Sequence, residues 1–239
     1  MKVLGIAAKW VFVLCLPVLL LTASIAWVAN SLWLYEYGFE KYNVSSTTGL
    51  ADAELEKVAA GLISYFNSSA EDISITVVKD GQPFNLFTPE ETIHFRDVKG
   101  LIWLDYWVLL GTLLYSAGYA VVSLVWHKRR YWRRLAWGVV GGSSVALALM
   151  LALGLGTLFD FDQLLLQFHL ISFGNDYWFA EGYMLLLFPE LLFDATLFCA
   201  LATTAGAVIL GGVAGAHLLR NRKGLLPSNT IKESPSIDH

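Results

Sequence analysis

Four long apolar segments constrain the fold of this chain more than any other feature of its sequence. They cover residues 10–29, 103–126, 135–158 and 191–219, and each reaches the length of about 20 residues that a helix needs to cross a bilayer. Only 15% of the residues are charged and the mean hydropathy is +0.56, whereas a soluble domain carries about 25% charged residues. The sequence therefore predicts an all-α integral membrane protein with four transmembrane helices.

The Lys and Arg residues predict the orientation of these helices. Eleven of the sixteen lie before the first segment, between the second and third, or after the fourth, and the other five lie in the long loop after the first segment. Basic residues accumulate on the cytoplasmic side of a membrane. We therefore expect both termini to be cytoplasmic and the first and last interhelical loops to face outward.

The first segment has some features of a cleavable signal peptide. Lys2 and Lys9 are basic residues at its start, and 29-ANS-31 resembles a cleavage site. Its apolar run is longer than the core of a typical signal peptide, so a retained helix is predicted.

The first outer loop is long enough to fold into a small α+β cap. Apolar residues recur at helical spacing over residues 51–66, and 73–78 is typical of a strand ended by a turn at 80–81. The stretch 88-TPEETIHFRDVK-99 opens with a capping box, in which Thr88 is the N-cap and Glu91 reaches back to it. A short helix is therefore predicted at 88–99.

The second outer loop begins with an amphipathic pattern after residue 159, which is typical of a helix lying in the membrane interface. The predicted organisation divides the chain into a transmembrane helix at 1–29, an extracytoplasmic cap at 30–102, a transmembrane helix at 103–126, a basic cytoplasmic loop at 127–134, a transmembrane helix at 135–158, an interfacial loop at 159–190, a transmembrane helix at 191–219 and a cytoplasmic tail at 220–239. The third helix is rich in small residues, which allow close packing of helices in lipid.

Two of the five histidines, His94 and His169, lie in the outward-facing parts of the chain near the membrane surface. Each is followed by a carboxylate, Asp97 in the first case and Asp176 in the second. Because unpaired polar groups are costly in a medium of low dielectric constant, we expect these groups to satisfy one another or to act on a ligand. The other three histidines are interpreted as incidental.

Several chemistries are consistent with these histidines. An acid–base pair is possible because histidine titrates near neutral pH. A zinc site is a weaker interpretation, since the spacing matches no HExxH helix. No GxSxG motif is present, and Cys15 and Cys199 lie inside apolar segments as small buried residues. Base-assisted transfer or hydrolysis on a lipid-like substrate therefore remains. The chain has no basic run interleaved with aromatic residues, so nucleic acid is not an expected partner.

Three short motifs, H-x-x-D-V-K at 94–99, F-H-x-x-x-F-x-N-D-x-W at 168–178 and P-E-x-x-x-D at 189–194, occur on four spans with an outer cap. This combination resembles the bacterial membrane family of the lipoprotein intramolecular transacylase Lit. The resemblance implies transfer of the sn-2 acyl chain of a diacylglyceryl-modified lipoprotein to the α-amine of its N-terminal cysteine. It implies an active site outside the bacterial cytoplasmic membrane, with His94 and His169 as catalytic residues and with lipoprotein and membrane lipid as partners. No cofactor or metal is expected.

The resemblance also suggests roles for the neighbouring residues. We expect His169 to be the base and His94 to stabilise the oxyanion or protonate the leaving oxygen, although the reverse assignment is also consistent. Asp97 or Asp176 would fix a histidine tautomer. The remaining candidates are Asn175 as an oxyanion donor, Arg96 as a partner of a phosphate or of Asp97, Phe173, Tyr177 and Trp178 as walls for acyl chains or as interfacial anchors, and Glu190 and Asp194 as loop caps or site residues.

Two other functions fit the same residues. A lipid or lipoprotein hydrolase would use the same histidine pair, and a membrane scaffold or sensor would use the histidines only structurally. The sequence makes no prediction of oligomeric state.

Overall fold

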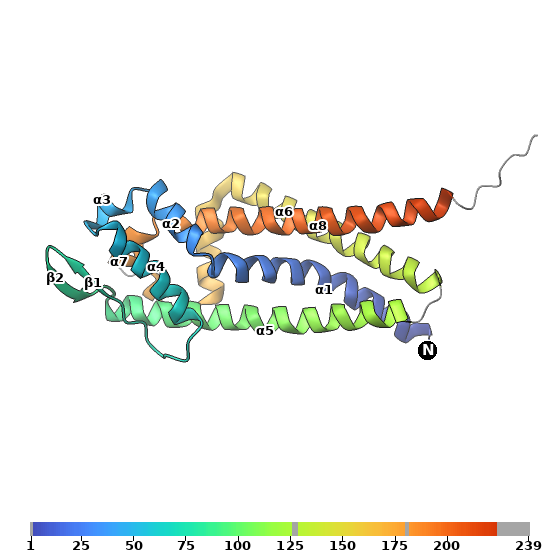
Figure 1. The fold of residues 1–239 in the computed structure, drawn as a ribbon, viewed down its shortest axis with the longest axis horizontal. Helices are drawn as coiled ribbons and strands as arrows, with labels where there is room; N and C mark the ends of the chain where they lie inside the picture. The colour runs from blue at the N-terminus through green and yellow to red at the C-terminus, as the bar shows by residue number, and fades with distance from the viewer. Residues whose placement is uncertain (1, 126–128, 180–181, 224–239) are drawn as a thin grey trace, which may run out of the picture.

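The computed structural model describes residues 2–125, 129–179 and 182–223. Four of its helices are long and apolar enough to cross a membrane, and Figure 1 shows them along the long axis of the molecule. They are α1 (Lys2–Ala29), α5 (Pro89–Val125), α6 (Arg129–Ser172) and α8 (Leu191–Lys223). The fold class predicted from the sequence is confirmed. The predicted tail lies outside the described residues from position 224 onward, as does the start of the predicted basic loop.

Helix α5 is much longer than a membrane span. Its 37 residues extend over about 55 Å at 1.5 Å per residue, whereas the hydrocarbon core of a bilayer is about 30 Å thick. The part before residue 103 therefore projects beyond the membrane and belongs to the cap. The prediction of a separate short helix at 88–99 is wrong, because α5 continues through Gly100 into the apolar segment that follows.

The capping box at the start of α5 is confirmed. The backbone N–H of Thr88 donates to Glu91 Oε2 at 2.9 Å, and the N–H of Glu91 donates to Thr88 Oγ1 at 3.2 Å. This reciprocal pair satisfies two of the donors that a helix N-terminus leaves open.

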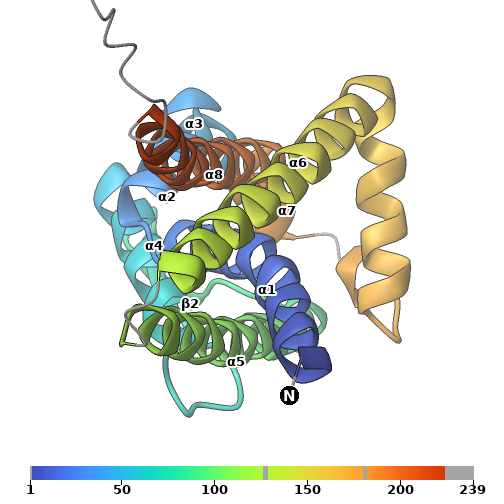
Figure 2. The same ribbon diagram turned by 90° about the vertical axis from the view of Figure 1, so that its right-hand side faces the viewer.

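Helix α6 changes direction at Asp160, whose backbone is non-helical at φ −164° and ψ 93°. Asp160 Oδ1 accepts the N–H of Gln163 at 2.9 Å, so it acts as an N-cap for the second half of the helix. Figures 1 and 2 show that this second half runs across the long axis of the bundle. A helix is thus present after residue 159, where the sequence predicts one, and its position in the membrane interface stays a prediction.

Helix α1 packs against the other three long helices. Helix α6 approaches α1 closely at Gly142, where a Cβ atom would lie 2.8 Å from Leu16 Cβ and 3.0 Å from the carbonyl oxygen of Val13. Between α1 and α8 the buried hydroxyl of Thr203 donates to Ser24 Oγ at 3.0 Å. The small residues of the third span thus serve close packing, as predicted.

The cap lies at one end of the bundle (Figure 1). From the first outer loop it contains α2 (Leu32–Lys41), α3 (Val44–Thr48), α4 (Asp52–Phe66) and a hairpin of β1 (Thr76–Lys79) and β2 (Gln82–Asn85). The second outer loop adds a 3₁₀ turn η1 (Tyr177–Phe179) and α7 (Tyr183–Leu187). The helix predicted at 51–66 is confirmed. The predicted strand is shifted to begin at residue 76.

The predicted turn is also confirmed. Asp80 and Gly81 have φ values of 53° and 78°, which is the backbone that a two-residue hairpin turn requires at both central positions. Lys79 therefore pairs with Gln82 across the antiparallel hairpin.

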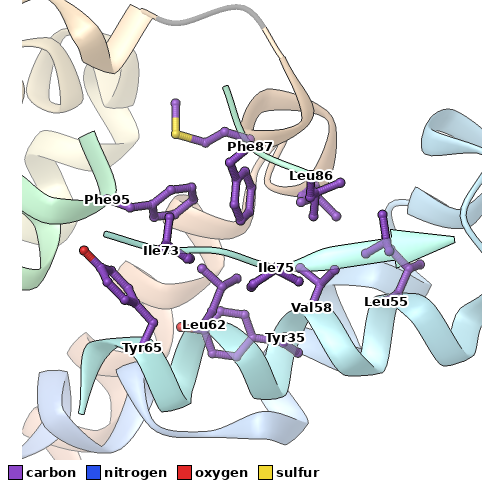
Figure 3. Packing of buried hydrophobic residues seen from close by; sticks show 14 of the residues in the cluster. Tyr35, Leu55, Val58, Leu62, Tyr65, Ile73, Ile75, Leu86, Phe87 and Phe95 are labelled. Atoms are coloured by element: carbon purple, nitrogen blue, oxygen red, sulfur yellow. The ribbon is translucent and has the colours of Figure 1, made fainter. Parts of the chain in front are cut away.

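A single apolar core holds the cap to α5 (Figure 3). The predicted apolar face of α4 is fully buried, and it packs in one cluster with Ile73, Ile75, Leu86, Phe87 and the α5 residue Phe95. Lys99 of α5 is also buried. Its ammonium group donates to the carbonyl oxygen of Ala70 at 2.7 Å and lies 4.2 Å from the Tyr65 ring centroid. The cap therefore cannot move independently of the first turns of α5.

A second connection joins the cap to α8. Asp194 is buried, and its carboxylate accepts hydrogen bonds from Lys41 Nζ at 2.8 and 2.9 Å and from the Tyr42 hydroxyl at 2.9 Å. The charge-assisted bond to Asp194 raises the pKa of Lys41. Asp194 thus has the structural role that the sequence left open. Glu190 directly precedes α8 as its N-cap residue, and its carbonyl oxygen accepts the N–H groups of Phe193 and Asp194.

Candidate active site

The structure brings His94 and His169 together. Their ring centroids are 6.2 Å apart and the two rings are inclined by only 20°. His94 lies in the second turn of α5, and His169 lies in the last turn of α6. The change of direction at Asp160 allows α6 to bring His169 back toward α5.

The hydrogen bond of His169 determines its tautomer. Its Nδ1 lies 2.8 Å from the carbonyl oxygen of Leu165, one turn earlier in the same helix. A carbonyl oxygen only accepts hydrogen bonds, so Nδ1 carries the proton and Nε2 of a neutral ring has a free lone pair. His169 can therefore accept a proton at Nε2 without changing its hydrogen bond to the backbone.

His94 has different surroundings. Its side chain is buried at 7% exposure, and among the described residues its Nδ1 has no hydrogen-bond partner. Burial lowers the pKa of His94 to about 4, the neighbouring His169 acts in the same direction, and Asp97 opposes both. His94 is therefore uncharged at neutral pH, with a ring nitrogen available to a further group.

Aromatic side chains surround the pair. The ring of Phe173 meets His94 edge-on at a centroid distance of 5.0 Å, and Trp178 lies 4.7 Å from His169. Phe168 contacts His169 at 5.5 Å. Of the predicted aromatic residues, Phe173 and Trp178 thus lie at the site, whereas the side chain of Tyr177 is 41% exposed.

The polar neighbours hold the outer loop rather than a histidine. Asn175 Nδ2 donates to Asp97 Oδ2 at 2.8 Å, and Asn175 Oδ1 accepts the N–H of Tyr177 at 3.1 Å. For His169, the expectation that Asp97 or Asp176 fixes the tautomer is wrong, because the Leu165 carbonyl does this. The side chain of Asp176 is exposed. The amide of Asn175, predicted as an oxyanion donor, is already bonded to Asp97.

Arg96 is directed away from the site. It forms ion pairs with Asp72 and, at 3.4 Å, with Glu71, so the predicted pairing with Asp97 is wrong. Residues two apart on a helix point about 200° apart, which places Arg96 on the face opposite His94.

One group at the site was not indicated by the sequence. It is the backbone carbonyl of Leu165, which lies one turn before His169 and has no signal in the side-chain pattern.

Among the described ranges, no three His, Cys, Asp or Glu side chains are grouped so as to hold a metal ion.

Comparisons with known proteins concern the family and the fold of the chain. The model of the family described as lipoprotein intramolecular transacylase Lit matches residues 10–193. The structure of Lit from Bacillus cereus superposes with a TM-score of 0.77 at 17% identity, covering 93% of this chain and 100% of that one. Two variants of that protein, in which a histidine is replaced by arginine or by alanine, give TM-scores of 0.74 at 18% identity, with coverage of 93% of this chain and 96% and 97% of theirs. At such identity the solved structures show a shared fold. No curated protein sequence matches the chain.

Proposed function

Because the model of the lipoprotein intramolecular transacylase family covers most of the chain, the chain belongs to that family, and we propose that His94 and His169 form its active site. It is a membrane enzyme that moves the sn-2 acyl chain of a diacylglyceryl-modified lipoprotein to the α-amine of the N-terminal cysteine. The product is a lyso-form lipoprotein. The observation that carries the site assignment is the pairing of the two rings, together with the Nδ1 hydrogen bond of His169 that leaves Nε2 as the unprotonated nitrogen of the neutral ring.

The reaction forms an amide and breaks an ester. The neutral α-amine attacks the sn-2 carbonyl carbon, and the tetrahedral intermediate collapses with cleavage of the bond to the glyceryl oxygen. One proton leaves the nitrogen and one proton reaches the departing oxygen, so no water is consumed. An α-amine has a pKa of about 8, so one nearby base suffices to free it.

His169 is the base in this proposal. Its Nε2 accepts the proton of the amine, and the resulting positive ring is stabilised because Nδ1–H remains bonded to the Leu165 carbonyl. The same ring then returns the proton to the glyceryl oxygen.

His94 stabilises the oxyanion. As a neutral ring it has one N–H to donate, and it carries no positive charge that would repel a proton arriving at His169. Its buried Nδ1 has no partner in the described part of the chain, and a buried polar atom of this kind is costly until a ligand satisfies it. A substrate oxygen placed there removes that cost during the reaction.

The aromatic residues favour transfer over hydrolysis. Phe168, Phe173 and Trp178 contact the two rings and restrict the access of water to them. Since amine and ester belong to one molecule, holding both ends near the site makes the step unimolecular, which contributes up to about 7–11 kcal/mol in favourable cases. No nucleophilic side chain is needed.

The proposal also places the reaction on one side of the membrane. The histidine pair lies at the cap end of the bundle, and the Lys and Arg distribution assigns that end to the outside of the bacterial cytoplasmic membrane.

Expression in a bacterium that makes diacylglyceryl lipoproteins but cannot N-acylate them tests this function. Tandem mass spectrometry of the N-terminal lipopeptide is expected to show one acyl chain moved from glycerol to nitrogen at unchanged mass. His94→Gln and His169→Gln are expected to abolish the transfer, whereas His217→Gln at the other end of the bundle is expected to retain it.

Other outcomes identify the alternative functions. Loss of one acyl mass with the wild-type chain would indicate a hydrolase. Unchanged lipopeptide from well-expressed protein would favour a scaffold or sensor, and retained transfer in both histidine variants would exclude the proposed site.

A further inference from the structure

Glu91 makes a contact that its place in the capping box does not require. Its side chain is fully buried at 0% exposure. One carboxylate oxygen caps α5 through Thr88, as described above. The other, Oε1, accepts the backbone N–H of Met184 at 2.6 Å, across 93 residues of sequence. The carboxylate therefore joins the start of α5 to α7 in the second outer loop.

Gly182 shows how closely this loop approaches the carboxylate. A Cβ atom at position 182 would lie 2.6 Å from Glu91 Oε1 and 2.7 Å from Glu91 Cδ. The backbone of Gly182 has φ 175° and ψ −156°, an extended conformation that any residue can adopt. The absence of a side chain at this position is therefore explained by the carboxylate and not by backbone strain.

This contact lies beside the active site. Glu91 precedes His94 by one helical turn, and the loop bonded to it carries Trp178, whose ring lies 4.7 Å from His169. Asn175, on the other side of Trp178 in the sequence, is bonded to Asp97 of α5. The loop that contributes Trp178 is thus bonded to α5 through residues on both sides of it.

We propose that Glu91 is a positioning residue for acyl transfer. It holds the loop that carries Trp178 against His169, and so keeps the basic Nε2 aligned with the amine. This inference rests on the proposed function. A small displacement of a positioned group can lower a rate by up to about a hundredfold. We therefore expect loss of the Met184 contact to lower kcat by about ten- to hundredfold while KM changes by less than about threefold, because the acyl and peptide contacts of the substrate remain.

The test uses the full chain reconstituted in lipid with a synthetic diacylglyceryl lipopeptide, and kcat and KM are measured by mass spectrometry. Glu91→Gln replaces one of the two acceptor oxygens by an NH₂ group, which cannot accept the backbone N–H of Thr88 or of Met184. We therefore expect kcat to fall. Thr88→Ala is the matched control. It removes the other half of the capping box without touching Met184, and it is expected to lower Tm while kcat stays within about twofold of wild type.

Gly182→Ala perturbs the same contact from the loop side. It is expected to lower kcat in the wild-type background, because its methyl group displaces the loop from Glu91 Oε1. In the Glu91→Ala background the clash is absent, and Gly182→Ala is expected to have no further effect.

Several results would overturn the inference. Glu91→Gln with the kcat of wild type would reduce Glu91 to a structural cap, and so would kcat values that track Tm equally in Glu91→Gln and Thr88→Ala. Additive losses from Glu91→Ala and Gly182→Ala would exclude a shared contact. If the wild-type chain transfers the acyl group and kcat is unchanged in all these variants, only the positioning role is refuted. If the wild-type chain shows no transfer, the proposed function is refuted and this inference with it.

Discussion

His94 and His169 are the same residue type at one site, yet their ring nitrogens meet different surroundings. His169 is hydrogen-bonded to a backbone carbonyl through Nδ1, which leaves Nε2 as the unprotonated nitrogen of the neutral ring. His94 is buried, and its Nδ1 has no partner among the described residues. In the proposed mechanism this difference in surroundings, more than the ring contact itself, makes His169 the proton acceptor and His94 the neutral hydrogen-bond donor.

The lowered pKa of His94 predicts a pH dependence of stability. The folded-state pKa is about 4 and the unfolded value is about 6.5, so between these values the unfolded chain binds more protons. Stability is therefore expected to fall as pH decreases from about 6.5 toward 4. Thermal unfolding of wild type and of His94→Gln, measured at pH 7, 6 and 5, checks this. The Gln variant is expected to lose less stability over that range, and equal losses in both proteins would contradict the assigned burial.

The contact partners of individual side chains were harder to predict from the sequence than the candidate residues themselves. The two histidines were identified from short motifs with their neighbours, and their roles stay a prediction. The partners of Arg96 were missed, because adjacency in sequence suggested Asp97 while neighbouring residues on a helix point about 100° apart. Glu71 and Asp72 reach Arg96 only once the cap has folded.

The elements of the bundle were the easiest to predict. Long apolar runs need little tertiary information, and all four appear as helices. The prediction separated the short helix at 88–99 from the following span, because a change from polar to apolar composition was read as a boundary. Composition changes where α5 leaves the membrane, but the backbone continues.

Close packing of α1 and α6 predicts a contrast between two glycines of the same helix. A Cβ atom at Gly142 would meet Leu16 and the backbone of Val13, whereas at Gly154 it would meet nothing within 4 Å. We expect Gly142→Ala to destabilise the bundle by about 1–3 kcal/mol through overpacking. Gly154→Ala is expected to be neutral or to stabilise it by up to about 1 kcal/mol, since alanine is the better helix former.

Thermal unfolding of the two variants in the same detergent gives the comparison. An equal or larger loss from Gly154→Ala would show that helix α6 packs differently from the arrangement described.

At the scale of the whole molecule, the cap and the bundle form one body. The apolar core of the cap includes α5, and the Lys41–Asp194 pair joins α2 to α8. The sequence predicted that a cap exists, but it assigned no elements to residues 30–50 and did not predict this pair. Long-range contacts of this kind depend on which surfaces meet after folding, which local patterns do not encode.

The predicted orientation is tested by labelling from outside the cell. In a background with Cys15→Ala and Cys199→Ala, a membrane-impermeant maleimide is expected to label Lys57→Cys on α4 in intact cells. Arg133→Cys, which is also at an exposed position but at the opposite end of the bundle, is expected to react only after the membrane is disrupted. The reverse pattern would invert the topology and place the histidine pair in the cytoplasm.

The turn at Asp160 has a consequence for how the enzyme meets its substrate. The half of α6 that follows it carries His169 across the bundle and exposes apolar side chains at Phe168, Leu170 and Ile171, so we expect the substrate to approach the proposed site from within the plane of the lipid. Encounter is then a two-dimensional search, and its rate follows the mole fraction of lipoprotein among the lipids. Diluting the substrate with inert lipid slows the enzyme even when the bulk concentration of substrate is held constant.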